Sequence, residues 1–170
     1  MKKLIIFMGP SGAGKHELAN YYKSKNDSAI IVDKREIEAN SSNKTLKEQK
    51  QIFYNTINKM LSIGNTIIII SHCVLQKDRK ELFDNLNLND IKIIGIWIEN
   101  NWQNIKFNNE NKEEKYKIPK ETLKFIFNYR SSPTKEEPFD DLVYLIMPEN
   151  IGMSKSYPYI DTIFNTLDKI

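Results

Sequence analysis

Five short apolar segments, most of them rich in isoleucine, alternate along this chain with longer amphipathic segments. The apolar segments cover residues 4–8, 29–32, 66–70, 91–98 and 142–147. Several show little apolar–polar alternation, which is typical of strands buried on both faces of a parallel sheet. Their alternation with helical patterns predicts an α/β fold, a doubly wound five-stranded parallel sheet flanked by helices.

Amphipathic helices are expected between and after these strands. Apolar residues recur at three- and four-residue spacing over residues 46–63, and the pattern ends at Gly64, which is typical of a helix C-terminus. Further helices are expected over residues 17–22, 76–86, 120–129 and 159–167. No linker rich in Pro, Gly or Ser divides the chain, so we expect one domain over residues 1–170.

The composition argues against several classes of function. The formal net charge of +3 is too small to indicate nucleic-acid or membrane binding by field alone. One cysteine excludes an intrachain disulfide framework, and two histidines leave little for a His-based metal site. Apolar runs such as residues 4–8 are too short for a membrane span or a signal-peptide core, so we expect a cytoplasmic protein that binds no membrane.

The strongest functional signal lies directly after the first expected strand. Residues 9–15 match G-x-x-x-x-G-K, a phosphate-binding loop that leads into a helix: Gly9, Pro10, Ser11, Gly12, Ala13, Gly14 and Lys15. The glycines allow successive N–H groups to turn inward, and the helix adds the positive end of its dipole. Lys15 supplies a charge for the β and γ phosphates, so the loop predicts an ATP-binding site.

The residue after this lysine departs from the pattern. A Ser or Thr hydroxyl is expected there as a ligand of Mg²⁺, and this chain has His16. Mg²⁺ prefers oxygen ligands, so imidazole is a poor replacement. Three outcomes stay open: the metal is held through water and phosphates alone, His16 contacts phosphate itself, or catalysis is weak or lost. We assign no residue as a metal ligand and expect Mg²⁺ to be held largely through phosphates and water.

Other classes of phosphate-loop protein lack support in the sequence. GTPases carry D-x-x-G and N-K-x-D patterns, and this chain has neither. Motor and AAA-type ATPases place a carboxylate at the end of a strand, whereas Ser71 and His72 follow the strand over residues 67–70. A small-substrate phosphotransferase is therefore favoured. Ser71 and His72 are candidates for its acceptor pocket, because ligands bind beyond the carboxyl ends of such strands.

Two segments carry a resemblance to a known family. The segments INKMLSIGNTIIII and IPKETLKFIFNYRSSPTKEEPFDDLVYL are typical of the polynucleotide 5′-hydroxyl kinase branch of P-loop kinases. The chain resembles this branch in layout over about residues 1–148, and the branch is related to gluconate-kinase-like and zeta-toxin-like kinases. The resemblance implies an ATP-dependent kinase that phosphorylates a hydroxyl of a nucleoside, a nucleotide or a nucleic-acid 5′ end.

The resemblance also implies roles for single residues. Lys15 would bind ATP, and Asp33, at the end of the second strand, matches the aspartate that accepts or orients the proton of the substrate hydroxyl. Arg35 is a candidate for binding phosphate on the acceptor, although the family spacing is Asp-x-x-Arg, and Arg79 matches a catalytic arginine. Asp33 could instead cap the next helix, and Arg79 could be a surface charge. Arg130 could stack on adenine or cap a helix.

A polar segment over residues 100–117 is expected to be a solvated loop that forms a lid over the site. The family places one or two arginines there, whereas this lid carries only lysines: Lys106, Lys112, Lys115 and Lys117. Lysine neutralises phosphate charge but makes no planar bidentate contact. Two alternatives therefore accompany the kinase interpretation: a degenerate protein that binds nucleotide without turnover, and a small-metabolite kinase of the gluconate type. The oligomeric state stays open.

Overall fold

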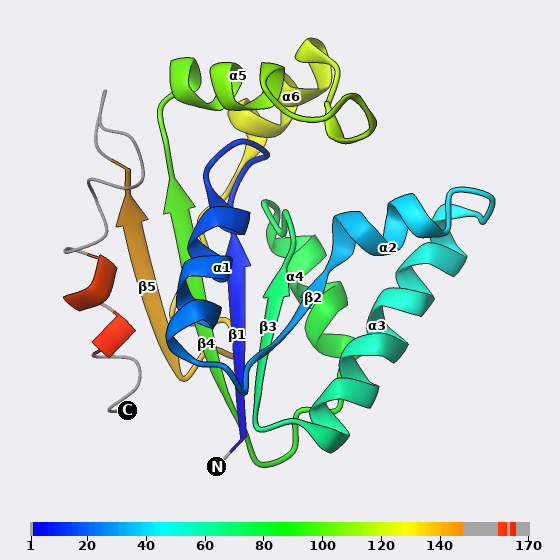
Figure 1. Cartoon of the computed structure of the whole chain (residues 1–170), viewed down its shortest axis with the longest axis vertical. Helices are drawn as coiled ribbons and strands as arrows, with labels where there is room; N and C mark the ends of the chain where they lie inside the picture. The colour runs from blue at the N-terminus through cyan, green and yellow to red at the C-terminus, as the bar shows by residue number, and fades with distance from the viewer. Residues whose placement is uncertain (1, 148–159, 163, 166–170) are drawn as a thin grey trace.

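A computed structural model describes residues 2–147, 160–162 and 164–165 of the chain. These described residues contain a five-stranded parallel sheet with the strand order β2-β3-β1-β4-β5 (Figure 1). In chain order the strands are β1 (Lys2–Met8), β2 (Ile30–Asp33), β3 (Thr66–Ile70), β4 (Ile91–Glu99) and β5 (Asp141–Ile146). The predicted α/β fold is therefore confirmed.

Helices connect the strands and cover both faces of the sheet (Figure 1). They are α1 (Lys15–Lys25), α2 (Lys34–Asn40), α3 (Leu46–Ile63), α4 (Gln76–Asp84), α5 (Trp102–Glu110), the 3-10 helix η1 (Glu114–Tyr116) and α6 (Lys120–Tyr129). The helix predicted over residues 159–167 lies partly outside the described residues, and residues 160–162 and 164–165 are helical. None of the helices in the described ranges has the length and apolar character needed to cross a membrane.

Alternate residues of the central strand β1 pack into two different hydrophobic layers. Ile5 and Phe7 pack in one cluster with Leu18 of α1, whereas Leu4 and Ile6 pack in a second cluster with the apolar face of α3. All four of these β1 side chains are fully buried. Burial on both faces explains why the strand shows no apolar–polar alternation.

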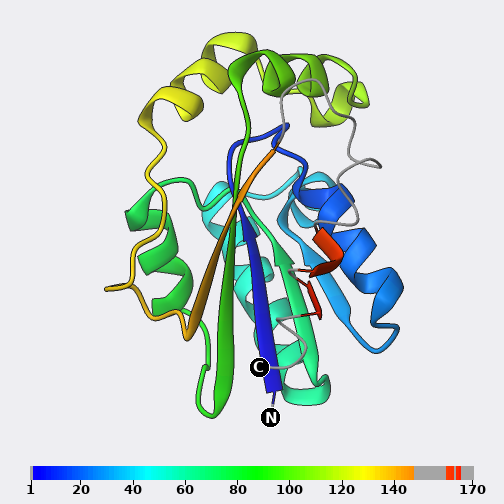
Figure 2. The same cartoon turned by 90° about the vertical axis from the view of Figure 1, so that its left-hand side faces the viewer.

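The polar segment over residues 100–117 is mostly helical, which corrects the expectation of a loop. The side chain of Asn101 accepts a hydrogen bond from the N–H of Asn104 and so caps α5. Asn109 bonds to both the N–H and the carbonyl of Ile118, which ties the end of α5 to the start of α6. α5, η1 and α6 lie across the carboxyl end of the sheet (Figure 2). The asparagines that suggested a loop therefore cap and brace helices.

A buried ion pair ties α4 to the segment that precedes β5. Arg79 is 1% exposed, and its Nε and Nη2 donate to the two carboxylate oxygens of Glu137 at 2.6 and 2.9 Å. Its Nη1 donates to the carbonyl oxygens of Cys73 and Ser131 at 2.9 and 2.8 Å. The guanidinium is therefore satisfied inside the protein, and it holds the connection between α6 and β5 against α4.

Arg79→Met and Glu137→Met should each lower the free energy of unfolding by about 3–5 kcal/mol, because each leaves one buried partner uncompensated. The double variant should lose clearly less than the sum of the single losses, since no buried charge remains. Urea unfolding followed by circular dichroism measures all three variants. Asp84→Asn, which removes the exposed Lys80–Asp84 pair of the same helix, is the control and should change stability little. Additive losses would contradict a buried pair.

Candidate functional site

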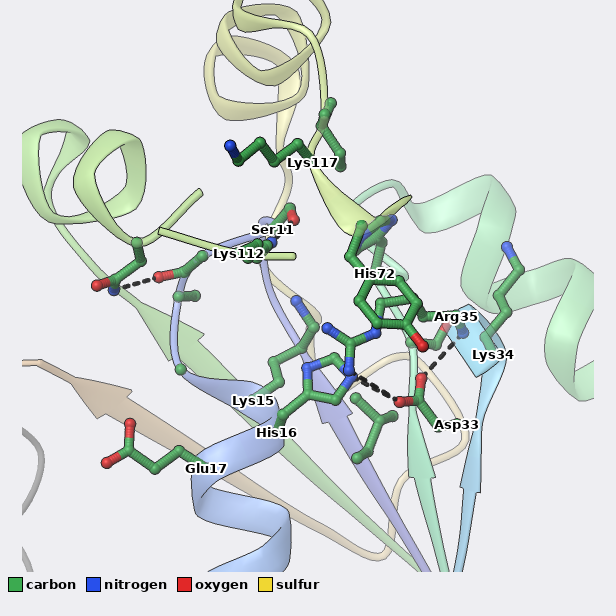
Figure 3. A pocket seen from close by; sticks show the side chains of 18 of the residues that line it. Ser11, Lys15, His16, Glu17, Asp33, Lys34, Arg35, His72, Lys112 and Lys117 are labelled. Atoms are coloured by element: carbon green, nitrogen blue, oxygen red, sulfur yellow. Dashed lines mark hydrogen bonds and ion pairs between the residues drawn. The ribbon is translucent and has the colours of Figure 1, made fainter. Parts of the chain in front are cut away.

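The phosphate loop (residues 9–15) borders a large pocket at the carboxyl end of the sheet. The pocket has a volume of about 850 Å³. Its walls come from the phosphate loop, the start of α2, the residues that follow β3, and the lid (residues 100–117) together with Ile118. Figure 3 shows Lys15, His16, Asp33 and Arg35 gathered on one side of this pocket. The pocket therefore lies where ligands bind in parallel α/β sheets, beyond the carboxyl ends of the strands.

The backbone of the phosphate loop takes conformations that favour glycine. Gly9, Gly12 and Gly14 have φ angles of 138°, 86° and 109°. A Cβ atom on Gly12 would also lie 2.6 Å from the carbonyl oxygen of Ile105 in α5. The glycines therefore permit both the tight turn into α1 and the close approach of the lid helix.

Lys15 is held inside the loop by backbone carbonyls. Its side chain is buried, and its Nζ donates to the carbonyl oxygens of Gly9 and Pro10 at 2.7 and 2.8 Å. Burial, and next the charge of Lys112, lower the pKa of Lys15 to about 7. Burial and the charge of Arg35 lower the pKa of Lys112 to about 8. The pocket thus concentrates positive charge that a bound anion would stabilise.

Asp33 and His16 form a hydrogen-bonded pair in the pocket wall. His16 Nε2 and Asp33 Oδ2 lie 2.7 Å apart, and Asp33 Oδ1 accepts from the N–H of Arg35 at 2.9 Å. The second bond makes Asp33 the N-cap of α2, in line with the capping alternative. Burial raises the pKa of Asp33, but the hydrogen bond with His16, with help from the backbone N–H and the charge of Arg35, outweighs it, so the net pKa is lowered. The carboxylate is therefore ionised at neutral pH.

Arg35 connects the start of α2 to the lid. Its guanidinium carbon lies 3.9 Å from the ring centroid of Tyr116 in η1, and its Nη2 lies 3.7 Å from Asp33 Oδ2. Its Nε is buried and has no hydrogen-bond partner among the described residues. A phosphate or carboxylate on an incoming substrate could supply the missing oxygen.

Two side chains of the lid contact the phosphate loop directly. Lys112 Nζ donates to Ser11 Oγ, and Asn108 Nδ2 donates to the carbonyl oxygen of Gly12 at 2.8 Å. Asn108 is a contact that the sequence interpretation missed. One asparagine in an asparagine-rich segment carries no sequence signal that marks it as a contact of the phosphate loop.

Of the other lid lysines, two line the pocket and one does not. Lys115 and Lys117 line the pocket together with Lys112, whereas Lys106 is not among the lining residues. Tyr116, which carries the stacking contact with Arg35, also lines the pocket but was not predicted to belong to the site. A tyrosine in a polar segment carries no sequence signal that separates a stacking partner from a packing anchor.

Ser71 and His72 line the pocket just after β3. The carbonyl oxygen of His72 accepts from the N–H of Gly9 at 3.1 Å, which joins this wall to the phosphate loop. Burial, and next the charge of Lys15, hold the pKa of His72 well below its ordinary value. Its imidazole is therefore neutral at pH 7 and contributes hydrogen bonds rather than charge.

The structure does not bring Arg79 and Arg130 into the pocket. Arg79 is enclosed by Glu137 and backbone carbonyls, which corrects the expectation of a catalytic role. Arg130 Nε donates to Glu99 Oε1 at 2.9 Å, and its Nη1 donates to the carbonyl oxygen of Phe127. Arg130 therefore caps the C-terminal turn of α6, which is the second of the two roles considered for it.

The part of the pocket that the structure describes holds no preformed cluster of metal ligands. Across the described ranges, no group of three or more His, Cys, Asp or Glu side chains could hold a metal ion. The position that supplies a hydroxyl in the usual pattern carries His16, whose imidazole is bonded to Asp33. Because Mg²⁺ prefers oxygen ligands in octahedral geometry, a metal would depend on phosphate oxygens and water.

Comparisons with protein-family models and with curated proteins give no match. Solved structures do match: an unliganded sugar kinase from Janibacter sp. has a TM-score of 0.70 at 14% identity, covering 99% of this chain and 95% of that chain. A fungal RNA kinase scores 0.68 at 14% identity over 99% and 86% of the two chains. The Mycobacterium tuberculosis APS kinase, solved with AMPPNP and APS, scores 0.63 at 14% identity over 95% and 97%. This chain shares the fold of these kinases.

Binding of a triphosphate at pH 8 should be accompanied by uptake of about one proton, because the anion raises the lowered pKa values of Lys15 and Lys112. The affinity should therefore fall as the pH rises from 7 to 9. Titration calorimetry of AMPPNP in buffers with different ionisation enthalpies measures the uptake. The Lys112→Met variant should take up fewer protons on binding AMPPNP than the native protein does. Net proton release on binding would contradict the pKa shifts.

Proposed function

We propose that this protein is an ATP-dependent kinase, acting as one domain over residues 1–170, that phosphorylates a hydroxyl of a nucleoside, a nucleotide or a nucleic-acid 5′ end. The observation that carries the proposal is the presence in one pocket of a lysine-bearing phosphate loop and the ionised carboxylate of Asp33. The P-loop kinase fold supports it, and one neighbour with this fold was solved with the ATP analogue AMPPNP.

The charges that line the pocket suit a polyanion. Six basic side chains and three carboxylates line it. The basic side chains are Lys15, Lys34, Arg35, Lys112, Lys115 and Lys117, and the carboxylates are Glu17, Asp33 and Glu38. The pocket's excess of three basic side chains thus equals the formal net charge of the whole chain, which is +3. A triphosphate would neutralise this local field, and the lysines would stabilise the charge on the transferred group.

In the proposed reaction, Lys15 and the phosphate loop bind the β and γ phosphates. The acceptor hydroxyl attacks the γ-phosphorus while Asp33 orients it and takes its proton, the bond to the bridging oxygen breaks, and ADP leaves. Arg35, Ser71 and His72, which line the same pocket, are proposed to bind the acceptor. Mg²⁺ would accompany ATP largely through phosphate oxygens and water, because the described residues contain no group of three or more potential metal ligands.

Two alternatives each have an observation in their favour. The sugar kinase among the structural neighbours favours a small metabolite as acceptor, whereas the fungal RNA kinase favours a nucleic-acid end. His16 at the position of the metal-binding hydroxyl favours a protein that binds nucleotide without turnover. The acceptor and the turnover are therefore separate questions, and one assay addresses both.

Incubation with γ-labelled ATP and Mg²⁺ should transfer label to at least one acceptor of a panel. The panel contains oligonucleotides with 5′-hydroxyl ends, nucleosides, nucleoside monophosphates and gluconate. Labelling of an oligonucleotide, nucleoside or nucleotide supports the proposal, and labelling of gluconate alone favours the metabolite kinase. Stabilisation by ATP without labelling of any acceptor would instead show nucleotide binding without turnover.

Asp33→Asn should lower transfer at least about a hundredfold, far more than it lowers nucleotide affinity, because the amide can still cap α2 but cannot accept the proton. Steady-state transfer and equilibrium binding of AMPPNP measure the two effects separately. Asp84→Asn, the same substitution on the exposed face of α4, should leave both unchanged. Near-normal transfer by Asp33→Asn would remove this carboxylate from the mechanism.

A further inference from the structure

The imidazole of His16 is fixed by a carboxylate from a different element. His16 belongs to the first turn of α1, and Asp33 ends β2; their side chains meet with Nε2 and Oδ2 at 2.7 Å. Asp33 is 4% exposed in its side chain, and its other oxygen is occupied by the N–H of Arg35. The carboxylate therefore cannot turn away easily, and the orientation of the imidazole ring is set by this contact.

This contact also determines which ring nitrogen is available. An ionised carboxylate only accepts hydrogen bonds, so Nε2 of His16 carries the proton that Asp33 accepts. Within the described residues, Nδ1 of His16 makes no hydrogen bond. In Figure 3 the ring lies beside Lys15, with the edge opposite Asp33 on the lysine side of the pocket. The side chain remains one-third exposed, so a ligand can reach it.

We propose that His16 is a phosphate ligand that replaces the metal-binding hydroxyl of the usual phosphate loop. In this role the imidazole is protonated on both nitrogens: Nε2 donates to Asp33, and Nδ1 donates to an oxygen of the bound nucleotide phosphates. The inference rests on the proposed nucleotide site. It adds to that site a positive charge where other loops hold a metal ligand, and the charge-assisted bond compensates for the poor fit to Mg²⁺.

The charged groups around His16 decide when this second proton is present. The titratable and charged groups that share its pocket are Lys15, Glu17, Asp33, Lys34, Arg35, Glu38, His72, Lys112, Lys115, Tyr116 and Lys117. A smaller cavity of about 460 Å³ that His16 also lines adds Lys23 and Glu36. The basic groups of this set outnumber its carboxylates. Phosphate oxygens arriving beside Lys15 add negative charge and tip the balance towards imidazolium, so nucleotide binding and protonation of His16 are coupled.

Nuclear magnetic resonance of the ring nitrogens tests this coupling directly, because the chain has only two histidines. In ¹⁵N-labelled protein at pH 7.5, saturating AMPPNP should move the His16 signals to positions typical of imidazolium. The signals of His72, whose pKa is held well below its ordinary value, should keep neutral positions. The His16→Gln variant assigns the signals, and Asp33→Asn should abolish the change because the supporting charge is lost.

Measurements of AMPPNP affinity on variants of His16 test the same inference independently of the NMR signals. His16→Asn, which keeps a hydrogen-bonding side chain but cannot become cationic, should bind AMPPNP about tenfold more weakly at pH 6.5. His16→Ser should make AMPPNP binding more dependent on Mg²⁺ than it is in the native protein. Binding of AMPPNP with unchanged His16 signals would overturn the inference and leave the kinase proposal intact. Failure to bind AMPPNP at all would overturn both.

Discussion

The turn from β1 into α1 determines where every other part of the site can lie. β1 is the central strand and its side chains are buried on both faces, so its carboxyl end is fixed in the middle of the sheet. Gly9 and Gly12 allow the chain to turn there against the backbone carbonyls of Ile98 and Ile105. Lys15 then begins α1 with a buried side chain whose ammonium group needs oxygen partners. The carbonyl oxygens of Gly9 and Pro10, in the phosphate loop that borders the pocket, supply them.

Features with a local signal could be predicted from the sequence. The strands were recognisable from uninterrupted apolar runs, and the phosphate loop from glycine spacing that a tight turn requires. The helical structure of the lid was not predictable, because asparagines in a polar segment suggest a loop until their bonds to helix ends are seen. Arg79 was misjudged for a related reason: its partner Glu137 is 58 residues away in sequence, and only the fold shows that they meet.

Asp33 is the point at which structure and proposed chemistry are most tightly connected. Its carboxylate caps α2, accepts from His16 and faces the pocket, and its lowered pKa keeps it ionised. A low pKa makes a carboxylate better at orienting a hydroxyl and stabilising a neighbouring cation than at holding a proton. The same property therefore supports both the proposed role towards the acceptor hydroxyl and the proposed role in supporting His16.

The central claim is that the phosphate loop binds the triphosphate of ATP. A crystal structure of the complex with AMPPNP tests it most directly. The β and γ phosphates should lie within the turn formed by residues 9–15, and Lys15 Nζ should have exchanged at least one of its bonds to Gly9 and Pro10 for a phosphate oxygen. Phosphates bound elsewhere in the pocket, with both carbonyl bonds of Lys15 intact, would contradict the claim.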